Sequence, residues 1–161
     1  MRYILLDRIT SFVSGTSLSA IKAISSSEDF FQEHFPGNPV MPGALMIEAA
    51  AQAGTALFEL SSNYTVKAFL IMVHEAKFRT LVRPGETLTF SLVVSETASD
   101  HGRVACEVTS TLPGAKQTRV ATMDLTFGIR PVAEFYSEGA QMLVRAMYAN
   151  LLRGLRSEGT S

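Results

Sequence analysis

Residues 44–59 read ALMIEAAAQAGTALFE and are apolar almost all round. A helix of this composition is buried on most of its sides. Pro42 comes just before the stretch and suits a helix start, because the N–H that proline lacks would be unpaired there anyway. The sequence therefore predicts a buried helix over residues 43–60, around which the rest of the chain must wrap.

The polar exceptions in this helix recur at spacings of four, three and four, which puts them in one stripe: Glu48, Gln52, Thr55 and Glu59. Glu48 and Gln52 lie one turn apart and can hydrogen-bond to each other. One interpretation is that the stripe faces solvent, since carboxylates are seldom buried. The other is that Glu48, deep in an apolar run, acts as a general acid.

Strand patterns flank the helix on both sides. Alternating apolar and polar residues predict four long strands over residues 66–79, 87–96, 103–112 and 118–129. Two shorter strands, residues 1–9 and 18–24, are expected around a turn at Ser14-Gly15-Thr16. The fold class is α+β, with a long antiparallel sheet wrapped around the central helix.

A further helix is predicted after Pro131, which closes a domain of residues 1–130 and leaves a helix and tail in residues 131–161. Over residues 137–156 an apolar stripe recurs every four positions: Leu143, Met147, Leu151 and Leu155. Burying each such side chain is worth roughly 1.5–3 kcal/mol. We therefore expect the helix to pack on the protein, by covering the sheet region or by joining dimers, rather than to lie on a membrane.

The bulk composition excludes several classes of protein. The 161 residues suit one domain, and 47% hydrophobic with 18% charged residues is typical of a globular chain. A net charge of −1 gives no indication of nucleic-acid binding or membrane insertion. Cys106 is the only cysteine, which fits a reducing, cytoplasmic compartment. The apolar run in the first residues is too short for a signal peptide.

Residues 34–43 read HFPGNPVMPG, a segment whose three prolines and two glycines leave it few conformations. Such a loop can hold the side chain of His34 still. Histidine is the side chain best suited to proton transfer near neutral pH. A single histidine in a loop is more often a surface residue, so the assignment depends on the residues around it.

Taken together, His34-Phe35-Pro36-Gly37, Pro42-Gly43, Glu48 and Gln52 resemble the β-hydroxyacyl-[acyl-carrier-protein] dehydratase family of the hot-dog fold. The fourteen-residue spacing from His34 to Glu48 matches the family pattern, as does Gln52 four residues later. The resemblance continues through HEAKFR at 74–79 and RPGE at 83–86, and it covers residues 3–129.

The resemblance implies a mechanism and named roles. Neutral His34 would take the C2 proton of the substrate, and Glu48 would help the C3 hydroxyl leave as water. The backbone N–H of Gly43, at the positive end of the helix, would stabilise charge on the thioester oxygen. Gln52 would orient Glu48, and neither a metal nor another cofactor is implied.

The resemblance also implies partners. The substrate would be an acyl chain on the 4′-phosphopantetheine of an acyl carrier protein. The chain would form a homodimer, or a trimer of dimers, in which His34 of one subunit faces Glu48 of the other across an acyl tunnel. Carrier proteins are acidic, so Lys77, Arg79 and Arg83 are candidate docking residues. Lys77 and Arg79 are expected to share one face of a strand, and the alternative is that all three are ordinary solvated charges.

Three features depart from the family pattern: His74 stands where aspartate is common, the usual longer N-terminal region has no counterpart, and the helix over residues 137–156 is additional. Glutamate at position 48 favours dehydration alone over dehydration with double-bond isomerisation, although PVMPG at 39–43 is close to the isomerising subclass. A hot-dog thioesterase and a non-catalytic subunit of a synthase are the alternative functions.

Overall fold

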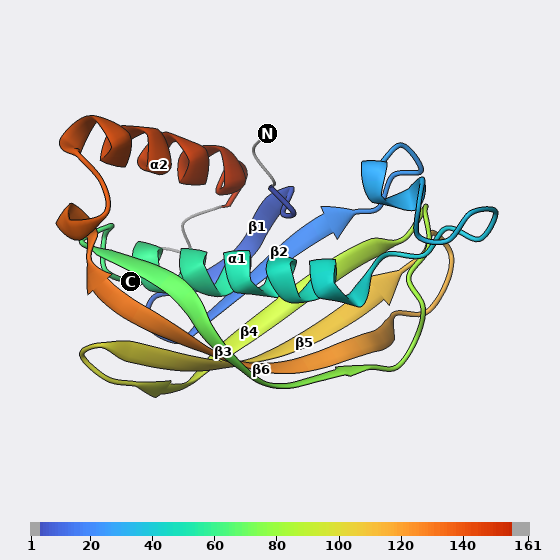
Figure 1. Ribbon diagram of the computed structural model, residues 1–161, viewed down its shortest axis with the longest axis horizontal. Helices are drawn as coiled ribbons and strands as arrows, with labels where there is room; N and C mark the ends of the chain where they lie inside the picture. The colour runs from blue at the N-terminus through green and yellow to red at the C-terminus, as the bar shows by residue number, and fades with distance from the viewer. Residues whose placement is uncertain (1–3, 156–161) are drawn as a thin grey trace.

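In the computed structural model, which describes residues 4–155, the chain forms one antiparallel sheet under a central helix (Figure 1). The strands lie in the order β1-β2-β4-β5-β6-β3. Their bounds are β1 Arg8–Val13, β2 Ser17–Ala23, β3 Val66–Phe78, β4 Thr87–Thr97, β5 His101–Thr111 and β6 Thr118–Pro131. The sheet curves around α1 (Gly43–Ser61), which confirms the predicted α+β class and hot-dog architecture.

The alternation predicted for the long strands is confirmed for β5, most of β6 and the first half of β4, where every second side chain is buried, but β3 shows no such alternation. These side chains include Leu88, Phe90, Leu92, Val104, Cys106, Val108, Met123, Leu125 and Phe127. The core therefore lies between the concave face of the sheet and α1.

Small residues let α1 lie close to the sheet. Gly54 is the tightest position, because a Cβ atom there would stand 2.3 Å from the ring of Phe127. Alanines at 49, 50, 53 and 56 are fully buried beside it. The Ala-rich composition thus serves both helix formation and close packing.

The first strand was predicted in the wrong place. β1 begins at Arg8, not within residues 1–7, and the first three residues lie outside the described part of the chain. The N–H of Leu5 donates to Oε1 of Gln52 on α1 instead of to a strand. Leu5 and Leu6 are buried, so their hydrophobicity reflects contact with the core and not strand pairing. The turn at residues 14–16 is where the sequence predicted it.

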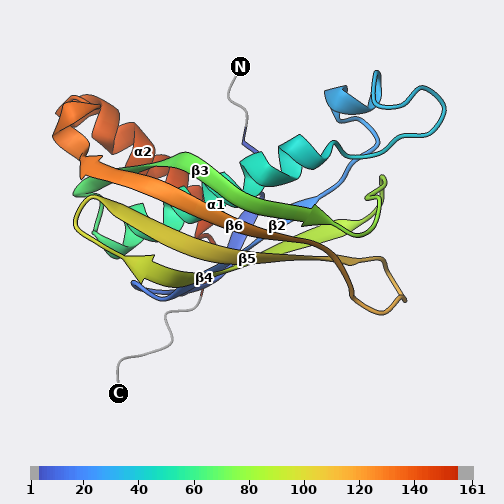
Figure 2. The same cartoon turned by 60° about the horizontal axis from the view of Figure 1, so that its bottom comes forward.

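The long segment between β2 and α1 is irregular apart from the short helix η1 (Asp29–Phe31). Figures 1 and 2 both show it projecting beyond the N-terminal end of α1. Near the end of this segment, the N–H of Met41 donates to the carbonyl of Val82, in the loop between β3 and β4, at 2.9 Å. No helix within residues 4–155 is long and apolar enough to cross a membrane.

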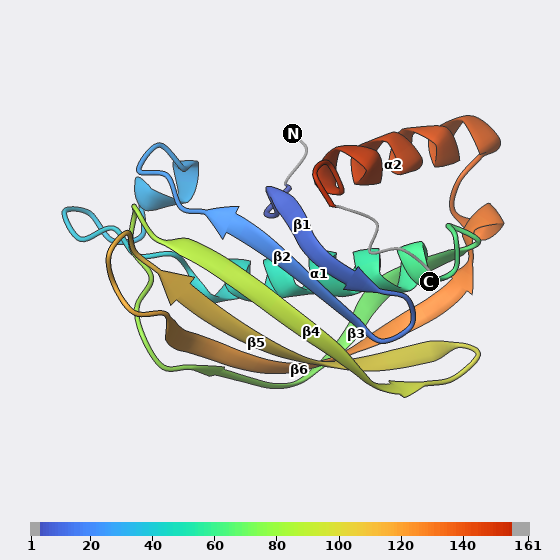
Figure 3. The same ribbon diagram turned by 180° about the vertical axis from the view of Figure 1, so that it is seen from behind.

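The helix α2 (Glu138–Leu151) follows the short helix η2 (Val132–Glu134) and packs on its own chain, over the C-terminal part of α1 (Figures 1 and 3). The prediction that this helix packs on the protein is therefore confirmed. It covers α1 and the segment before β1, and it also contacts β1 at the edge of the sheet.

Most of the predicted stripe is confirmed, since Met147, Leu151 and Leu155 pack against the core, but its first residue and the predicted end of the helix were wrong. Leu143 is 61% exposed, and the face turned toward the protein carries Val144, Met147, Tyr148 and Leu151. A strict spacing of four drifts around a helix of 3.6 residues per turn, so a contact face mixes steps of three and four. The helix ends at Leu151, three residues before Gly154 at φ 91°. Arg156, the predicted last residue, lies outside the described residues.

Candidate active site

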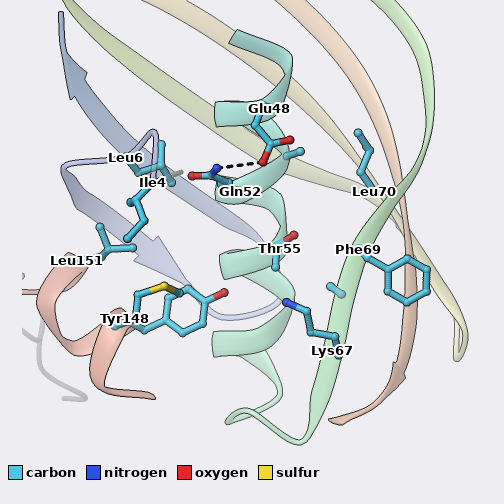
Figure 4. Close-up of a pocket in the computed structure, with 13 residues that line it drawn as sticks. Ile4, Leu6, Glu48, Gln52, Thr55, Lys67, Phe69, Leu70, Tyr148 and Leu151 are labelled. Carbon is cyan, nitrogen blue, oxygen red and sulfur yellow. Dashed lines mark hydrogen bonds between the residues drawn. The ribbon is translucent and has the colours of Figure 1, made fainter. Parts of the chain in front are cut away.

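Glu48 lies on the outer side of α1 and is held by Gln52 one turn later. Nε2 of Gln52 donates to Oε1 of Glu48 at 3.0 Å, while Oε1 of Gln52 accepts from the N–H of Leu5 at 2.9 Å (Figure 4). The backbone donor at Leu5 fixes which end of the amide faces Glu48, because only the amide oxygen can accept from it. Glu48 is thus presented in one orientation.

The four side chains of the polar stripe on α1 differ in how far they are buried. Glu48 is exposed in the single chain, Gln52 and Thr55 are half-buried, and Glu59 is buried at 2% exposure. The expectation that Glu48 is buried is therefore wrong for one chain by itself, since no other element of residues 4–155 covers it. The solvent-facing interpretation is in turn wrong for Glu59.

His34 is fixed by the loop that follows it. Its Nδ1 lies 2.9 Å from the carbonyl oxygen of Val40, and its own carbonyl accepts from the N–H of Val40 at 3.0 Å. A carbonyl can only accept, so Nδ1 carries the hydrogen and Nε2 keeps its lone pair in the neutral ring. The ring is half-buried and stacks on Phe35 with centroids 4.3 Å apart. In this tautomer Nε2 is able to accept a proton.

A pocket of about 400 Å³ opens along the outer side of α1. Figure 4 shows Glu48 and Gln52 toward one end of it and Lys67 and Tyr148 toward the other, with Leu6 and Leu70 on opposite walls. The complete lining is Ile4, Leu6, Glu48, Ala51, Gln52, Thr55, Lys67, Ala68, Phe69, Leu70, Met147, Tyr148 and Leu151. His34 is not among these residues, so one chain brings Glu48 and Gln52 together but does not bring His34 to them.

Gly43 is the first residue of α1, where backbone N–H groups lack acceptors within the helix and the helix dipole is positive. A Cβ atom at this position would stand 3.0 Å from the ring of Phe78. The glycine therefore allows the start of the helix and the end of β3 to meet.

The three basic residues singled out in the sequence are all exposed, but they are not equivalent. Nζ of Lys77 pairs with Oε1 of Glu75 at 2.8 Å. The guanidinium of Arg83 donates to the side chain of Asn38 in the His34 loop. Arg79 comes just after β3, and its backbone N–H donates to the carbonyl of Val120. It follows the strand that carries Lys77, so the expectation that both lie in one strand is wrong.

One buried cluster was not predicted from the sequence. Nζ of Lys67 lies 2.6 Å from Oε1 of Glu59, and the hydroxyl of Tyr148 donates to Oε2 of Glu59 at 2.7 Å. Burial, together with the negative charge of Glu59, raises the pKa of Tyr148, so the phenol stays protonated and can donate. Glu59 was visible as the end of the polar stripe, but its partners lie 8 and 89 residues away along the chain. The side chains that complete the cluster, Lys67 and Tyr148, lie on β3 and α2, which come close to Glu59 only in the folded chain.

The FabA-like domain family matches residues 1–121. The chain is 42% identical over 123 residues to a 3-hydroxyacyl-[acyl-carrier-protein] dehydratase FabZ of Lactiplantibacillus plantarum, covering 76% of this chain and 80% of that protein. It is 38% identical over 128 residues to the protein of the same name from Oenococcus oeni, covering 79% and 88%. A Streptococcus mutans protein solved with acetyl CoA shares the fold, with a TM-score of 0.62 at 14% identity over 81% of this chain and 94% of that one.

Proposed function

Because the chain belongs to the FabA-like family, together with FabZ dehydratases, we propose that it is a 3-hydroxyacyl-[acyl-carrier-protein] dehydratase of fatty-acid or related acyl-chain synthesis, with His34 and Glu48 as its proton-transfer pair. The observation that carries the assignment of residues is the fixed orientation of Glu48 by Gln52 at the pocket. The tautomer of His34 imposed by Val40 supports it.

The chemistry follows from these two groups. Nε2 of neutral His34 takes the C2 proton, and the electron pair of that C–H bond forms the C2–C3 double bond as the C3–O bond breaks. Glu48 in its acid form gives a proton to the departing hydroxyl, which leaves as water. Negative charge that builds on the thioester oxygen is stabilised by the N–H of Gly43 at the start of α1. Gln52 keeps Glu48 directed at the hydroxyl, and proton exchange with water restores both groups.

A homodimer supplies the missing histidine in this proposal. Strand β3 lies at the edge of the sheet and exposes three consecutive apolar side chains, Ile71, Met72 and Val73, at 40–54%. An unpaired apolar edge strand is a template for pairing with another chain. Pairing of two β3 edges would bring a second subunit alongside the Glu48 pocket, with its His34 loop as the source of the base.

A direct assay tests the function. On β-hydroxyacyl thioesters we expect enoyl absorbance without release of free thiol, and on saturated acyl thioesters we expect no reaction. A thioesterase would instead release thiol from both substrates. Glutamate at position 48 leads us to expect the trans-2-enoyl product alone, without the isomerised product. Thiol release as the main reaction would overturn the proposal, and absence of both reactions would favour a non-catalytic subunit.

The acyl carrier protein is proposed to dock beside the His34 loop, where Arg83 contacts Asn38, and on the exposed Arg79 four residues earlier in the chain. The charge reversal Arg79→Glu should raise the KM for carrier-protein substrates several-fold more than for coenzyme A analogues, because only the carrier protein presents an acidic surface. Steady-state kinetics on matched substrate pairs measure this difference.

The matched control is Arg130→Glu, an exposed arginine at the opposite end of the sheet, which should leave both KM values unchanged. Arg83→Glu is a less selective variant, because it also removes the bond to Asn38 in the His34 loop. An equal rise in KM for both substrate types in Arg79→Glu would remove the docking role.

A further inference from the structure

The pocket beside Glu48 has a definite direction. Its polar floor follows α1 from Glu48 through Gln52 to Thr55, and its far end is formed by Lys67 and Tyr148 (Figure 4). At about 1.5 Å per helical residue, the seven residues from Glu48 to Thr55 span about 10 Å. The pocket is therefore an elongated groove that begins at the proposed acid.

The walls of this groove suit an apolar chain. Ile4 and Leu6 line one side, Phe69 and Leu70 the other, and Met147 and Leu151 come from α2. Lys67 also lines it, but its ammonium group is neutralised by Glu59. Ligand pockets of this size are mostly apolar with a few polar groups at the reacting end. With C3 of the substrate at Glu48, the remainder of the acyl chain would run toward α2.

At the far end of the groove, Lys67 of β3 faces α2, and α2 lies outside the family match, which ends at residue 121. Helix α2 is anchored there by the hydroxyl of Tyr148, which donates to the buried carboxylate of Glu59. Glu59 also accepts from Lys67 and from the N–H of Ala68. The guanidinium of Arg145 stacks on Tyr64, 4.8 Å from its ring centroid, at the turn after α1. Opening this end would leave a buried carboxylate short of a partner, which is costly.

We infer that α2 closes the acyl pocket and sets the maximum length of the substrate, with Met147 and Tyr148 as the residues that stop the chain. The inference rests on the proposed function. An extended chain of single bonds advances about 1.2 Å per bond, so about 10 Å of groove holds a tail of about eight carbons beyond C3. The protein is thus a dehydratase for short and medium acyl chains.

The test is a panel of β-hydroxyacyl thioesters from four to sixteen carbons, with kcat/KM measured for each. Wild-type protein should lose activity steeply on the longest chains. In Met147→Ala the ratio of long-chain to short-chain kcat/KM should rise by about tenfold or more, since added room for each methylene in an apolar pocket is worth about that factor. The four-carbon substrate does not reach α2, so its kcat/KM in each variant is the reference for this ratio.

The matched control is Met142→Ala, the same substitution on the same helix at a side chain that is 72% exposed and outside the pocket.

A second variant should change the preferred chain length in the opposite direction. Thr55→Met should fill the groove midway and shift the optimum to shorter chains, and it does not depend on the packing of α2.

The outcomes are distinct. Opposite shifts in Met147→Ala and Thr55→Met support the inference, and if Met147→Ala does not fold, the milder Met147→Val, which also shortens the side chain, takes its place. Equal wild-type activity on the shortest and longest substrates, or a Met147→Ala profile identical to that of Met142→Ala, would overturn it while leaving the dehydratase function intact. Absence of dehydration at every length would instead contradict the proposed function itself.

Discussion

Replacing His34 by alanine or Glu48 by glutamine is expected to lower kcat for dehydration by about 10²–10⁴-fold, the usual contribution of a positioned general acid or base. Each variant removes one of the two proton transfers and leaves the other group in place. His34 lies in a loop and Glu48 is exposed on α1, so neither change creates a cavity in the core. Circular dichroism should therefore give spectra and melting temperatures close to those of the wild type.

Matched controls separate this result from a general effect of substitution. His101→Ala and Glu134→Gln remove the same chemical groups at a half-buried and an exposed position outside the pocket, and both should retain wild-type turnover. Near-normal turnover in a folded His34→Ala or Glu48→Gln protein would show that the residue concerned has no role in proton transfer.

Mixing the two inactive variants and allowing their subunits to exchange is expected to restore about a quarter of wild-type activity. In the proposed two-fold dimer, each site would take His34 from one subunit and Glu48 from the other. Random exchange at equal concentrations makes half of the dimers mixed, and each mixed dimer has one intact site and one that lacks both groups. The recovery therefore exceeds the activity of either parent by an order of magnitude or more.

Native mass spectrometry of isotope-labelled subunits measures the exchange independently of activity. A mixture of labelled and unlabelled His34→Ala protein serves as the control, because it exchanges without making an intact site. Complete exchange with no recovery would place His34 and Glu48 of each site in the same subunit. An active monomer in sedimentation would do the same.

Local patterns predicted most of the fold, because strands with one buried face and a helix buried on most sides leave clear periodicities. The four long strands and α1 lie within a few residues of their predicted bounds. The first strand was misplaced because Leu5 and Leu6 are buried without being paired in the sheet. Apolar residues alone do not distinguish contact with a helix from contact within a sheet.

The sequence predicted some features of the candidate site and missed others. The family resemblance led to His34, Glu48 and Gln52 as candidate site residues, and the bond between Gln52 and Glu48 follows from their separation of one helical turn. The sequence did not reveal that Glu48 is exposed in one chain or that Arg83 holds the His34 loop through Asn38. Such contacts depend on elements that are distant in sequence, as does the bond from Tyr148 to Glu59.

The order of the strands determines how the chain unfolds. Along the chain, α1 and β3 lie between the paired strands β2 and β4, while β4 and β5 lie between the paired strands β3 and β6. Each of these two pairings has one strand of the other within its span, so a cut between β3 and β4 would break both at once. A domain of this size with such overlapping pairings unfolds as one cooperative unit. The position of Glu48 on α1 is accordingly maintained by the whole sheet, and not by the segment of chain around it.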